Sequence, residues 1–297
     1  MAADQVRVAA HAKVNLFLRV LGREHDGYHQ LETAFALLEL ADELVVRRAG
    51  PGVTLTVHGP DLGPPDENLA VRAARAVLQA TGGKFGVEIE LTKRIPVRAG
   101  LGGGSSDAAA ALHAVNALAN GAVPRAELLH FAARLGADVP FFVSETSLAI
   151  AWGRGERLFR LDPLPAAAAL VAVPPVGVST PEAYRWLDEA RGIAVERRGA
   201  VTFDASTFAT WGSVGRASGN DFELPVFGHH PELRTLFERL AATHPYWVRL
   251  CGSGSAVAAV YATERLRDDA AAQMGTRHQQ LLKTATRAAP APAPEPL

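Results

Sequence analysis

A glycine-rich stretch between an alternating segment and an alanine-rich segment constrains this chain more than any other feature. Residues 96–111 read P-V-R-A-G-L-G-G-G-S-S-D-A-A-A-A, with four glycines closely followed by two serines and an aspartate. Glycine permits positive φ and leaves no Cβ beside a bound group, whereas Ser and Asp favour helix N-termini. Residues 87–91 alternate apolar with polar and predict a half-buried strand before the loop, and residues 108–120 predict a helix after it.

This strand–loop–helix order predicts a phosphate site, because the free N–H groups at a helix N-terminus and the positive end of its dipole bind anions. Two familiar phosphate loops do not fit. A P-loop requires lysine after its last glycine, but Ser105 follows Gly104. The dinucleotide fingerprint G-x-G-x-x-G fails because Ser105 stands three residues after Gly102. A glycine-rich turn that merely links a strand to a helix is the alternative at this point.

The composition fits a globular protein with one large or two medium domains. The chain has 297 residues, of which 48% are hydrophobic, enough to bury a full core. Its formal net charge of −1 predicts no general attraction to nucleic acid or anionic membranes. It has no membrane-length apolar run and no signal-peptide layout, and its single cysteine, Cys251, excludes an internal disulfide. We therefore predict a cytoplasmic protein without nucleic-acid or membrane partners; its oligomeric state stays open.

Polar residues near the N-terminus form a second group of candidates. Lys13 and Asn15 lie two apart in a predicted strand over 6–20, so they share one face of that strand. Lys13 is either a site cation or an ordinary solvated lysine. Tyr28 and His29 follow an Asp-Gly turn, where a ring and an imidazole can meet a ligand. A surface hairpin with a packed tyrosine is the alternative there.

Two later segments carry further candidates. Asp138 lies in the apolar sequence G-A-D-V-P-F-F, and a buried carboxylate is costly unless it is paired, hydrogen-bonded or functional. Its alternative role is a helix cap before Pro140. The sequence C-G-S-G-S at 251–255 is a second Gly-Ser loop, which by itself is either a ligand contact or a turn.

Other segments give expectations about the fold. Residues 43–48 and 53–57 predict a pair of strands across Gly-Pro-Gly. Residues 31–40 fit a helix and a strand equally well. Residues 265–287 predict one helix, and the Pro/Ala-rich residues 288–297 predict a disordered or extended tail.

Four segments together resemble the superfamily of galactokinases, homoserine kinases, mevalonate kinases and phosphomevalonate kinases. In chain order they are A-K-V-N-L-F-L with G-R-E-H-D-G-Y-H, P-V-R-A-G-L-G-G-G-S-S-D-A, L-G-A-D-V-P-F-F-V and C-G-S-G-S. The first and third segments, with D-G-Y-H, more narrowly resemble the family of 4-diphosphocytidyl-2-C-methyl-D-erythritol kinases. The resemblance covers residues 12–255.

This resemblance implies an α+β, two-domain small-molecule kinase fold with its active site in the inter-domain cleft. An ATP-binding and catalytic domain is expected over 1–160 and a substrate-side domain over 161–287, followed by a disordered tail over 288–297. The implied reaction phosphorylates the C2 hydroxyl of a substrate with a cytidine diphosphate handle, in non-mevalonate isoprenoid precursor synthesis. The ATP carries Mg²⁺, and no protein metal ligand is assigned. A homoserine or mevalonate type of kinase is the alternative.

The resemblance also assigns roles to residues. It implies that Asp138 is the catalytic base and Lys13 its cationic neighbour, that Tyr28 and Tyr184 stack on the cytosine and that His29 reads the edge of the base. The implied ATP-binding residues are Pro96, Val97, Arg98, Ala99, Gly100, Leu101, Gly102, Gly103, Gly104, Ser105, Ser106 and Asn68. The implied substrate-binding residues are Asn15, Tyr28, His29, Thr180 and Tyr184. The second glycine loop supplies Gly252, Ser253 and Gly254.

Two segments depart most from the family pattern, whereas Cys251 and the second serine of C-G-S-G-S are mild variants that keep both glycines. Arg98 stands where a small residue is usual, and its side chain either contacts phosphate or points outward. Ser144-Glu145 stands where a glycine-containing turn is expected.

Overall fold

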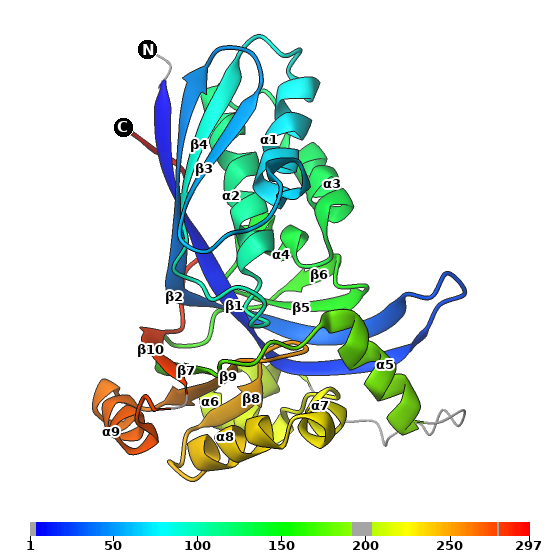
Figure 1. Cartoon of the computed structure of the whole chain (residues 1–297), viewed down its shortest axis with the longest axis vertical. Coiled ribbons are helices and arrows are strands. Elements are labelled where there is room, and N and C mark those ends of the chain that lie inside the picture. The colour runs from blue at the N-terminus through cyan, green and yellow to red at the C-terminus, as the bar shows by residue number, and fades with distance from the viewer. Residues whose placement is uncertain (1–3, 192–203, 278) are drawn as a thin grey trace.

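The computed structural model describes residues 4–191, 204–277 and 279–297, which form two β-sheets and their covering helices (Figure 1). The strands are β1 (Gln5–Arg23), β2 (His29–Ala49), β3 (Val53–His58), β4 (Gly86–Thr92), β5 (Leu148–Gly153), β6 (Arg157–Arg160), β7 (Ala168–Val173), β8 (Trp247–Leu250), β9 (Val257–Tyr261), β10 (Gln280–Ala285) and β11 (Glu295–Pro296). The α-helices are α1 (Leu69–Ala80), α2 (Gly103–Leu118), α3 (Arg125–Leu135), α4 (Val139–Val143), α5 (Thr180–Arg191), α6 (Trp211–Ala217), α7 (Glu223–His229), α8 (Pro231–Ala241) and α9 (Glu264–Met274). Short 3₁₀ turns are η1 (Pro65–Glu67) and η2 (Ala205–Phe208).

The first sheet has the order β11–β1–β2–β4–β3, with β5 paired to β2 and β6 to β5. The second sheet has the order β10–β7–β9–β8. Helices α1 to α4 lie against the first sheet, and α5 and α7 to α9 cover the second (Figure 1). The two sheets share a core in which Val14 and Leu16 of β1 lie with Val171 and Ala258. The α+β class is therefore confirmed.

The hairpin of β1 and β2 connects both layers and extends past the second sheet towards α5 (Figure 1). Its register shifts between His11 and Lys13 and again between Asn15 and Phe17. Irregularities of this kind bend a strand and re-aim its side chains. The central part of β1 is buried on both faces, which explains its dense apolar sequence.

Helix α2 lies at the centre of the first layer. Its alanines at 108–111 are all buried, as are Leu112, Val115 and Leu118. A helix that is apolar on all sides belongs inside a protein, and alanine lets the sheet and α1 approach closely. The sequence expectation of a strand, a glycine loop and a helix is met by β4 and α2.

The expected strand pair across Gly-Pro-Gly is wrong. Strand β3 pairs in parallel with β4, and β4 lies between β3 and β2. Residues 59–85 supply the crossover through α1 that a parallel pair requires. The loop between β2 and β3 passes directly over Gly86, where a Cβ would lie 2.1 Å from the carbonyl oxygen of Gly50. The ambiguous segment 31–40 is part of strand β2.

One expectation about the C-terminal region needs correction. Residues 265–287 do not form one helix, because α9 ends at Met274, its C-cap Gly275 has a φ of 63°, and β10 follows and pairs with β7. For residues 288–297 the extended alternative holds and the disordered one does not: the tail runs back along β1, and β11 pairs with it at Val6 and Arg7. The exposed edge of β1 offers unpaired backbone groups, which is why a short tail can add to it.

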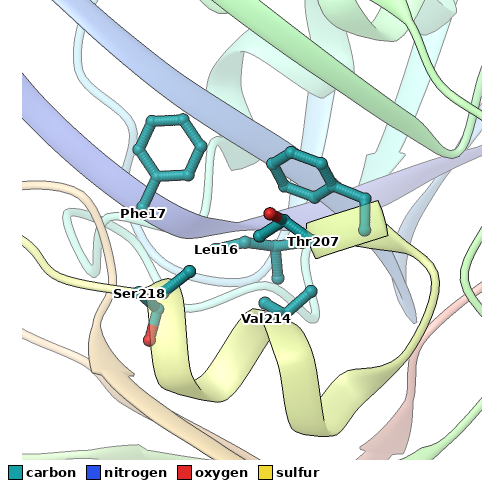
Figure 2. Close-up of a pocket in the computed structure, with 7 residues that line it drawn as sticks. Leu16, Phe17, Thr207, Val214 and Ser218 are labelled. Carbon is teal, nitrogen blue, oxygen red and sulfur yellow. The ribbon is translucent and has the colours of Figure 1, made fainter. Parts of the chain in front are cut away.

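A small pocket lies between β1 and the 207–218 segment. Figure 2 shows Leu16, Phe17, Thr207, Val214 and Ser218 around it. Its volume is about 10 Å³, at the lower limit for holding one water molecule, so it is a packing gap rather than a ligand site. Among the described helices, none combines the length and apolar character that a membrane span needs.

Candidate active site

Lys13 and Asp138, which are far apart in the sequence, lie next to each other. Lys13 Nζ is 3.3 Å from Asp138 Oδ2, and the lysine side chain is 4% exposed against 32% for the aspartate. Asp138 stands at the N-cap position of α4 but makes no capping hydrogen bond. The two alternatives from the sequence analysis, a solvated lysine at position 13 and a helix-capping role for Asp138, are therefore wrong. A buried cation faces a carboxylate that solvent can reach.

Asn15 fixes the position of the lysine. Its Oδ1 accepts a hydrogen bond of 2.7 Å from Lys13 Nζ, and its Nδ2 donates to Thr33 Oγ1 at 2.9 Å. Thr33 in turn donates to the carbonyl oxygen of Phe17 at 2.6 Å. The ammonium also lies 5.1 Å from the centroid of the Phe35 ring. Thr33 and Phe35 are site residues that the sequence reasoning missed, because nothing local distinguishes them from other strand residues.

The glycine loop closes directly over this lysine. A Cβ at Gly102 would lie 3.0 Å from Lys13 Cγ and 3.0 Å from Phe142 Cζ, and Gly102 has a φ of 72°. The backbone N–H of Lys13 donates to the carbonyl oxygen of Leu101 at 2.9 Å. Helix α2 begins at Gly103, directly after the close approach of Gly102 to Lys13, so the free N–H groups of its first turn lie at the end of the helix next to this lysine. Ser105 at this end is half-buried, whereas Ser106 is 2% exposed.

The two glycine loops touch. A Cβ at Gly100 would lie 1.8 Å from the carbonyl oxygen of Cys251, and the N–H of Ala256 donates to the carbonyl oxygen of Ala99 at 3.2 Å. The second loop is held from behind by Asn220, whose Nδ2 donates to the carbonyl oxygen of Gly252 at 2.7 Å. The same amide also donates to the carbonyl oxygen of Leu250 at 2.9 Å. The structure thus brings residues 96–106 and 251–255 into one site, and Asn220 is a supporting residue that the sequence did not reveal.

Both departures from the family pattern adopt left-handed backbone. Arg98 has a φ of 57° and Glu145 a φ of 54°. Glycine populates this region without strain, whereas other residues rarely adopt it. This explains why small residues and glycine are expected at these two places. Arg98 is exposed within the glycine-rich loop.

A buried ion cluster supports the loop from below. Lys93 forms an ion pair with Asp42 and another of 2.7 Å with Asp107, and all three side chains are at most 4% exposed. Asp42 Oδ1 also accepts the N–H groups of Arg94 at 2.5 Å and Ile95 at 2.8 Å. The sequence identified Asp107 only as a helix-starting residue, but it ties α2 to β2 and to the end of β4.

Asp107 gives this cluster a pH dependence. Burial raises the pKa of Asp107 to about 7 against the attraction of Lys93, from an ordinary value of 3.8. The folded state therefore holds a proton that the unfolded chain has lost, so this stabilisation is complete below about pH 4 and disappears as the pH rises through 7. We expect the free energy of unfolding of the wild type, relative to Asp107→Asn, to fall by roughly 2 kcal/mol between pH 5 and pH 8. Urea titrations at both pH values test this, and a constant difference would contradict it.

The turn that carries Tyr28 is held by Arg154. The guanidinium of Arg154 lies 4.0 Å from the Tyr28 ring centroid and pairs with Glu24 at 2.5 Å and with Asp26. Asp26 Oδ1 accepts the N–H of Tyr28 at 3.2 Å. The tyrosine is 59% exposed, so one ring face is supported and the side chain remains accessible. Arg154 is a supporting residue that the sequence analysis did not identify.

His29 and Tyr184 form a stack between the hairpin and α5. Their ring centroids are 4.4 Å apart at 18°, and His29 Nε2 lies 2.9 Å from Asp188 Oδ1. The edge-to-face contact of Tyr184 with Phe222 has a centroid distance of 4.9 Å. Burial, followed by the charge of Asp138, raises the pKa of Tyr184 to about 12, so the phenol stays neutral. A base that stacks on Tyr184 must use the face away from His29 or displace the imidazole.

Thr180 and Asn68, the two remaining candidates, make hydrogen bonds within the protein. Thr180 Oγ1 lies 2.9 Å from Ser253 Oγ, so the start of α5 joins the second glycine loop. Asn68 caps α1, where its Oδ1 accepts the N–H of Ala70 at 2.9 Å. Its contact with adenine therefore stays a prediction. Among the described residues, no group of three or more His, Cys, Asp or Glu side chains is arranged to hold a metal ion.

Comparison with known proteins identifies the class. Residues 68–146 match the model of the GHMP kinases N terminal domain, and residues 204–280 match that of the GHMP kinases C terminal domain. A homoserine kinase structure from Cytophaga hutchinsonii aligns over 99% of this chain and 98% of its own, with a TM-score of 0.79 and 20% identity. At this identity the likeness shows the fold alone. The chain is a GHMP kinase.

More similar relatives narrow the family. A 4-diphosphocytidyl-2-C-methyl-D-erythritol kinase from Pelotomaculum thermopropionicum (strain DSM 13744 / JCM 10971 / SI) is 38% identical over 95% of this chain and 98% of its own. One from Solibacter usitatus (strain Ellin6076) is 41% identical over 84% of this chain and 78% of its own. A crystal structure of 4-(cytidine 5'-diphospho)-2C-methyl-D-erythritol kinase aligns over 94% of this chain and 98% of its own, with a TM-score of 0.76 and 38% identity. This chain belongs to the family of 4-diphosphocytidyl-2-C-methyl-D-erythritol kinases, and the resemblance drawn from its motifs is confirmed.

Proposed function

We infer that this protein is an ATP-dependent kinase that phosphorylates the C2 hydroxyl of 4-diphosphocytidyl-2-C-methyl-D-erythritol in isoprenoid precursor synthesis. Its family membership supports this reaction. The observation that carries the mechanism is the contact of 3.3 Å between Lys13 Nζ and Asp138 Oδ2 beneath the glycine loop.

We propose that Asp138 accepts the proton of the C2 hydroxyl. That hydroxyl is tertiary and is a poor nucleophile until its proton leaves. The carboxylate is partly exposed, so a substrate oxygen can approach it, and Lys13 stabilises both the carboxylate and the developing alkoxide. Asn15 holds the ammonium in place through its Oδ1. General base catalysis accelerates a reaction by roughly 10²–10⁴-fold. Charge neutralisation and positioning of the substrates must supply the rest of the rate acceleration.

We propose that residues 96–106 bind the triphosphate. The free N–H groups of α2 and the positive end of its dipole favour the phosphate oxygens. Mg²⁺ would supply further neutralisation of charge on the transferred group. Ser105 in the first turn of α2 supplies an oxygen donor of the kind that Mg²⁺ prefers, and this fits an ion carried mainly by the nucleotide. Asn68 is proposed to contact the adenine.

The hairpin turn and the start of α5 are proposed to bind the cytidine handle. Tyr28 is exposed and supported by Arg154, Tyr184 presents a second ring, and His29 lies beside it. Asn15, which is bonded to Lys13, and Thr180, which is bonded to Ser253, are proposed to contact the rest of the substrate.

We also propose a division of the chain into domains over 1–160 and 161–287. Strand β6 ends at Arg160 and β7 starts the second sheet at Ala168. The two matched kinase segments fall on opposite sides of this boundary.

The substrate is tested with an ATP-consumption assay. Purified protein is supplied with 4-diphosphocytidyl-2-C-methyl-D-erythritol, homoserine or mevalonate at equal concentrations. We expect kcat/KM for the cytidine compound to exceed the other two by orders of magnitude. A higher value for homoserine or mevalonate would contradict the assignment and favour another GHMP kinase activity.

Replacement of Tyr28 separately tests the proposed binding of the cytidine group. Stacking on an aromatic ring is worth about 1–3 kcal/mol per base, so Tyr28→Ala should raise KM for the cytidine substrate by roughly 5- to 150-fold. KM for ATP should stay nearly unchanged, and Tyr28→Phe should retain most of the affinity. Tyr246→Ala, at a tyrosine that is 50% exposed elsewhere, is the matched control. Equal increases in both KM values would show that the turn does not bind the base.

A further inference from the structure

One face of α5 rests on the hairpin of β1 and β2 (Figure 1). Tyr184, Asp188 and Arg191 follow one another at spacings of four and three, so they share this face of the helix. Arg191 ties the helix to β1, because its Nη1 donates to the carbonyl oxygen of Val20 at 2.7 Å. The other two side chains both contact His29 at the start of β2. Two residues of one helix therefore hold a single imidazole.

Asp188 determines which nitrogen of His29 carries the proton. His29 Nε2 lies 2.9 Å from Asp188 Oδ1, and a carboxylate oxygen accepts, so Nε2 is the donor. In the neutral imidazole, Nδ1 is then an acceptor. Tyr184 fixes the plane of the ring by stacking on it at 4.4 Å between centroids. Helix α5 thus sets both the tautomer and the orientation of this imidazole.

Asp188 is held in turn by Arg23 on the hairpin. Arg23 Nη1 lies 3.9 Å from Asp188 Oδ2, and Arg23 Nε donates to the carbonyl oxygen of Gly27 at 3.3 Å. The side chains of Asp188 and Arg23 are 39% and 63% exposed, and ion pairs this open to solvent contribute little to stability. Loss of Asp188 should therefore change the position of His29 without unfolding the protein.

Nδ1 is the atom of this imidazole that a ligand can contact. The His29 side chain keeps 9% of its surface exposed. Nδ1 has no hydrogen-bond partner among the described residues, and it is not one of the unpartnered polar atoms that are shut off from solvent. The preceding residue is Tyr28, whose exposed ring is proposed to stack on the base. An unused acceptor thus belongs to the residue next to the proposed base-binding ring.

We propose that Asp188 is a positioning residue that makes the site selective for cytosine over uracil, because it holds His29 Nδ1 as an acceptor for the exocyclic amine of cytosine. Cytosine carries the N4 amine, a donor, where uracil carries the acceptor O4. Two acceptors that face each other share no proton, and a site built to bond an N–H group rejects the analogue that lacks it. This inference rests on the proposed binding of the cytidine handle by the hairpin turn.

Equilibrium binding of cytidine diphosphate and uridine diphosphate tests this selectivity without the kinase reaction. Isothermal titration calorimetry on the full chain, with a non-hydrolysable ATP analogue present to fill the triphosphate site, should give a Kd for the cytidine compound at least about 100-fold below that for the uridine compound. Asp188→Ala should reduce this preference about tenfold. In a His29→Ala background, Asp188→Ala should bring no further change, because both residues act through one acceptor. No preference in the wild type, or an unchanged preference in Asp188→Ala, would overturn the inference.

Glu189→Ala is the matched control, because Glu189 is an acid of the same helix that pairs with Arg185 rather than with His29. It should keep both Kd values. In ¹⁵N-histidine-labelled wild type, the neutral His29 should carry its proton on Nε2, and its Nδ1 resonance should shift with cytidine diphosphate and not with uridine diphosphate. A proton on Nδ1 would contradict the role of Asp188. If the protein selects cytidine diphosphate as expected but does not phosphorylate the cytidine substrate, the proposed reaction fails and the role of Asp188 stands.

Discussion

Asp138→Asn is expected to lower kcat by roughly 10²–10⁴-fold while ATP binding changes little. The amide keeps the size of the side chain but cannot accept the proton of the substrate hydroxyl. Asp138 lies 3.3 Å from the buried Lys13, and its carboxylate is accessible to solvent, as a general base must be to reach substrate. Single-turnover phosphorylation measures the chemical step, and equilibrium titration measures the affinity for ATP.

The control for this variant is Glu90→Gln, the same change of acid to amide at an exposed position of β4. It should leave kcat at the wild-type value. Lys13 loses its counter-charge in Asp138→Asn, which can destabilise the fold. The thermal unfolding of this variant should therefore be measured together with its kinetics, so that a loss of folded protein is distinguished from a loss of catalysis. Turnover near the wild-type level in a folded Asp138→Asn protein would remove Asp138 from the reaction.

Gly100→Ala is expected to be the most damaging change in the glycine-rich loop over 96–106. A Cβ there would lie 1.8 Å from the carbonyl oxygen of Cys251, and the φ of 80° is already unfavourable for alanine. The left-handed backbone costs about 1–2 kcal/mol, and relief of the clash requires the two glycine loops to separate. We expect a loss of stability on the order of 3 kcal/mol or more, together with a fall in kcat/KM of at least about 100-fold.

Gly228→Ala is the matched control, since a Cβ at Gly228 in α7 would meet nothing within 4 Å. It should leave activity unchanged and leave stability equal to wild type or slightly higher, because alanine favours helix. Urea denaturation and initial rates compare both variants. Wild-type stability in Gly100→Ala would show that the contact between the loops at Gly100 and Cys251 does not hold the site together.

Local patterns predicted local structure well. The alternation at 87–91, the four glycines and the following alanines gave a strand, a loop and a helix, because side-chain periodicity and backbone freedom are properties of the residues themselves. Pairing of strands was less predictable. The segments at 43–48 and 53–57 are both strands, but β4 lies between them after a helical crossover. Two strands joined by a short loop look like a hairpin in the sequence. Nothing local shows that a third strand, β4, comes to lie between them.

The residues of the candidate site could be predicted where they belong to a recognisable sequence motif. Lys13, Asp138 and the two glycine loops were chosen from the sequence, and the structure brings them together, although their roles stay proposals. The residues that hold them were missed. Arg154 and Asn220 act on residues 126 and 32 positions away, at Tyr28 and Gly252, and no local pattern marks such contacts.

By itself, the sequence determined the strand–loop–helix unit, the kinase family and the polar residues able to do chemistry, because motifs and periodicity are local. Only the tertiary structure decided which polar residues meet, that Asp107 pairs with Lys93 rather than merely starting a helix, and that the tail returns to β1. These outcomes depend on burial and on contacts between distant segments. Such contacts set the cost of each buried charge or unpaired group, and that cost is defined only once the chain has folded.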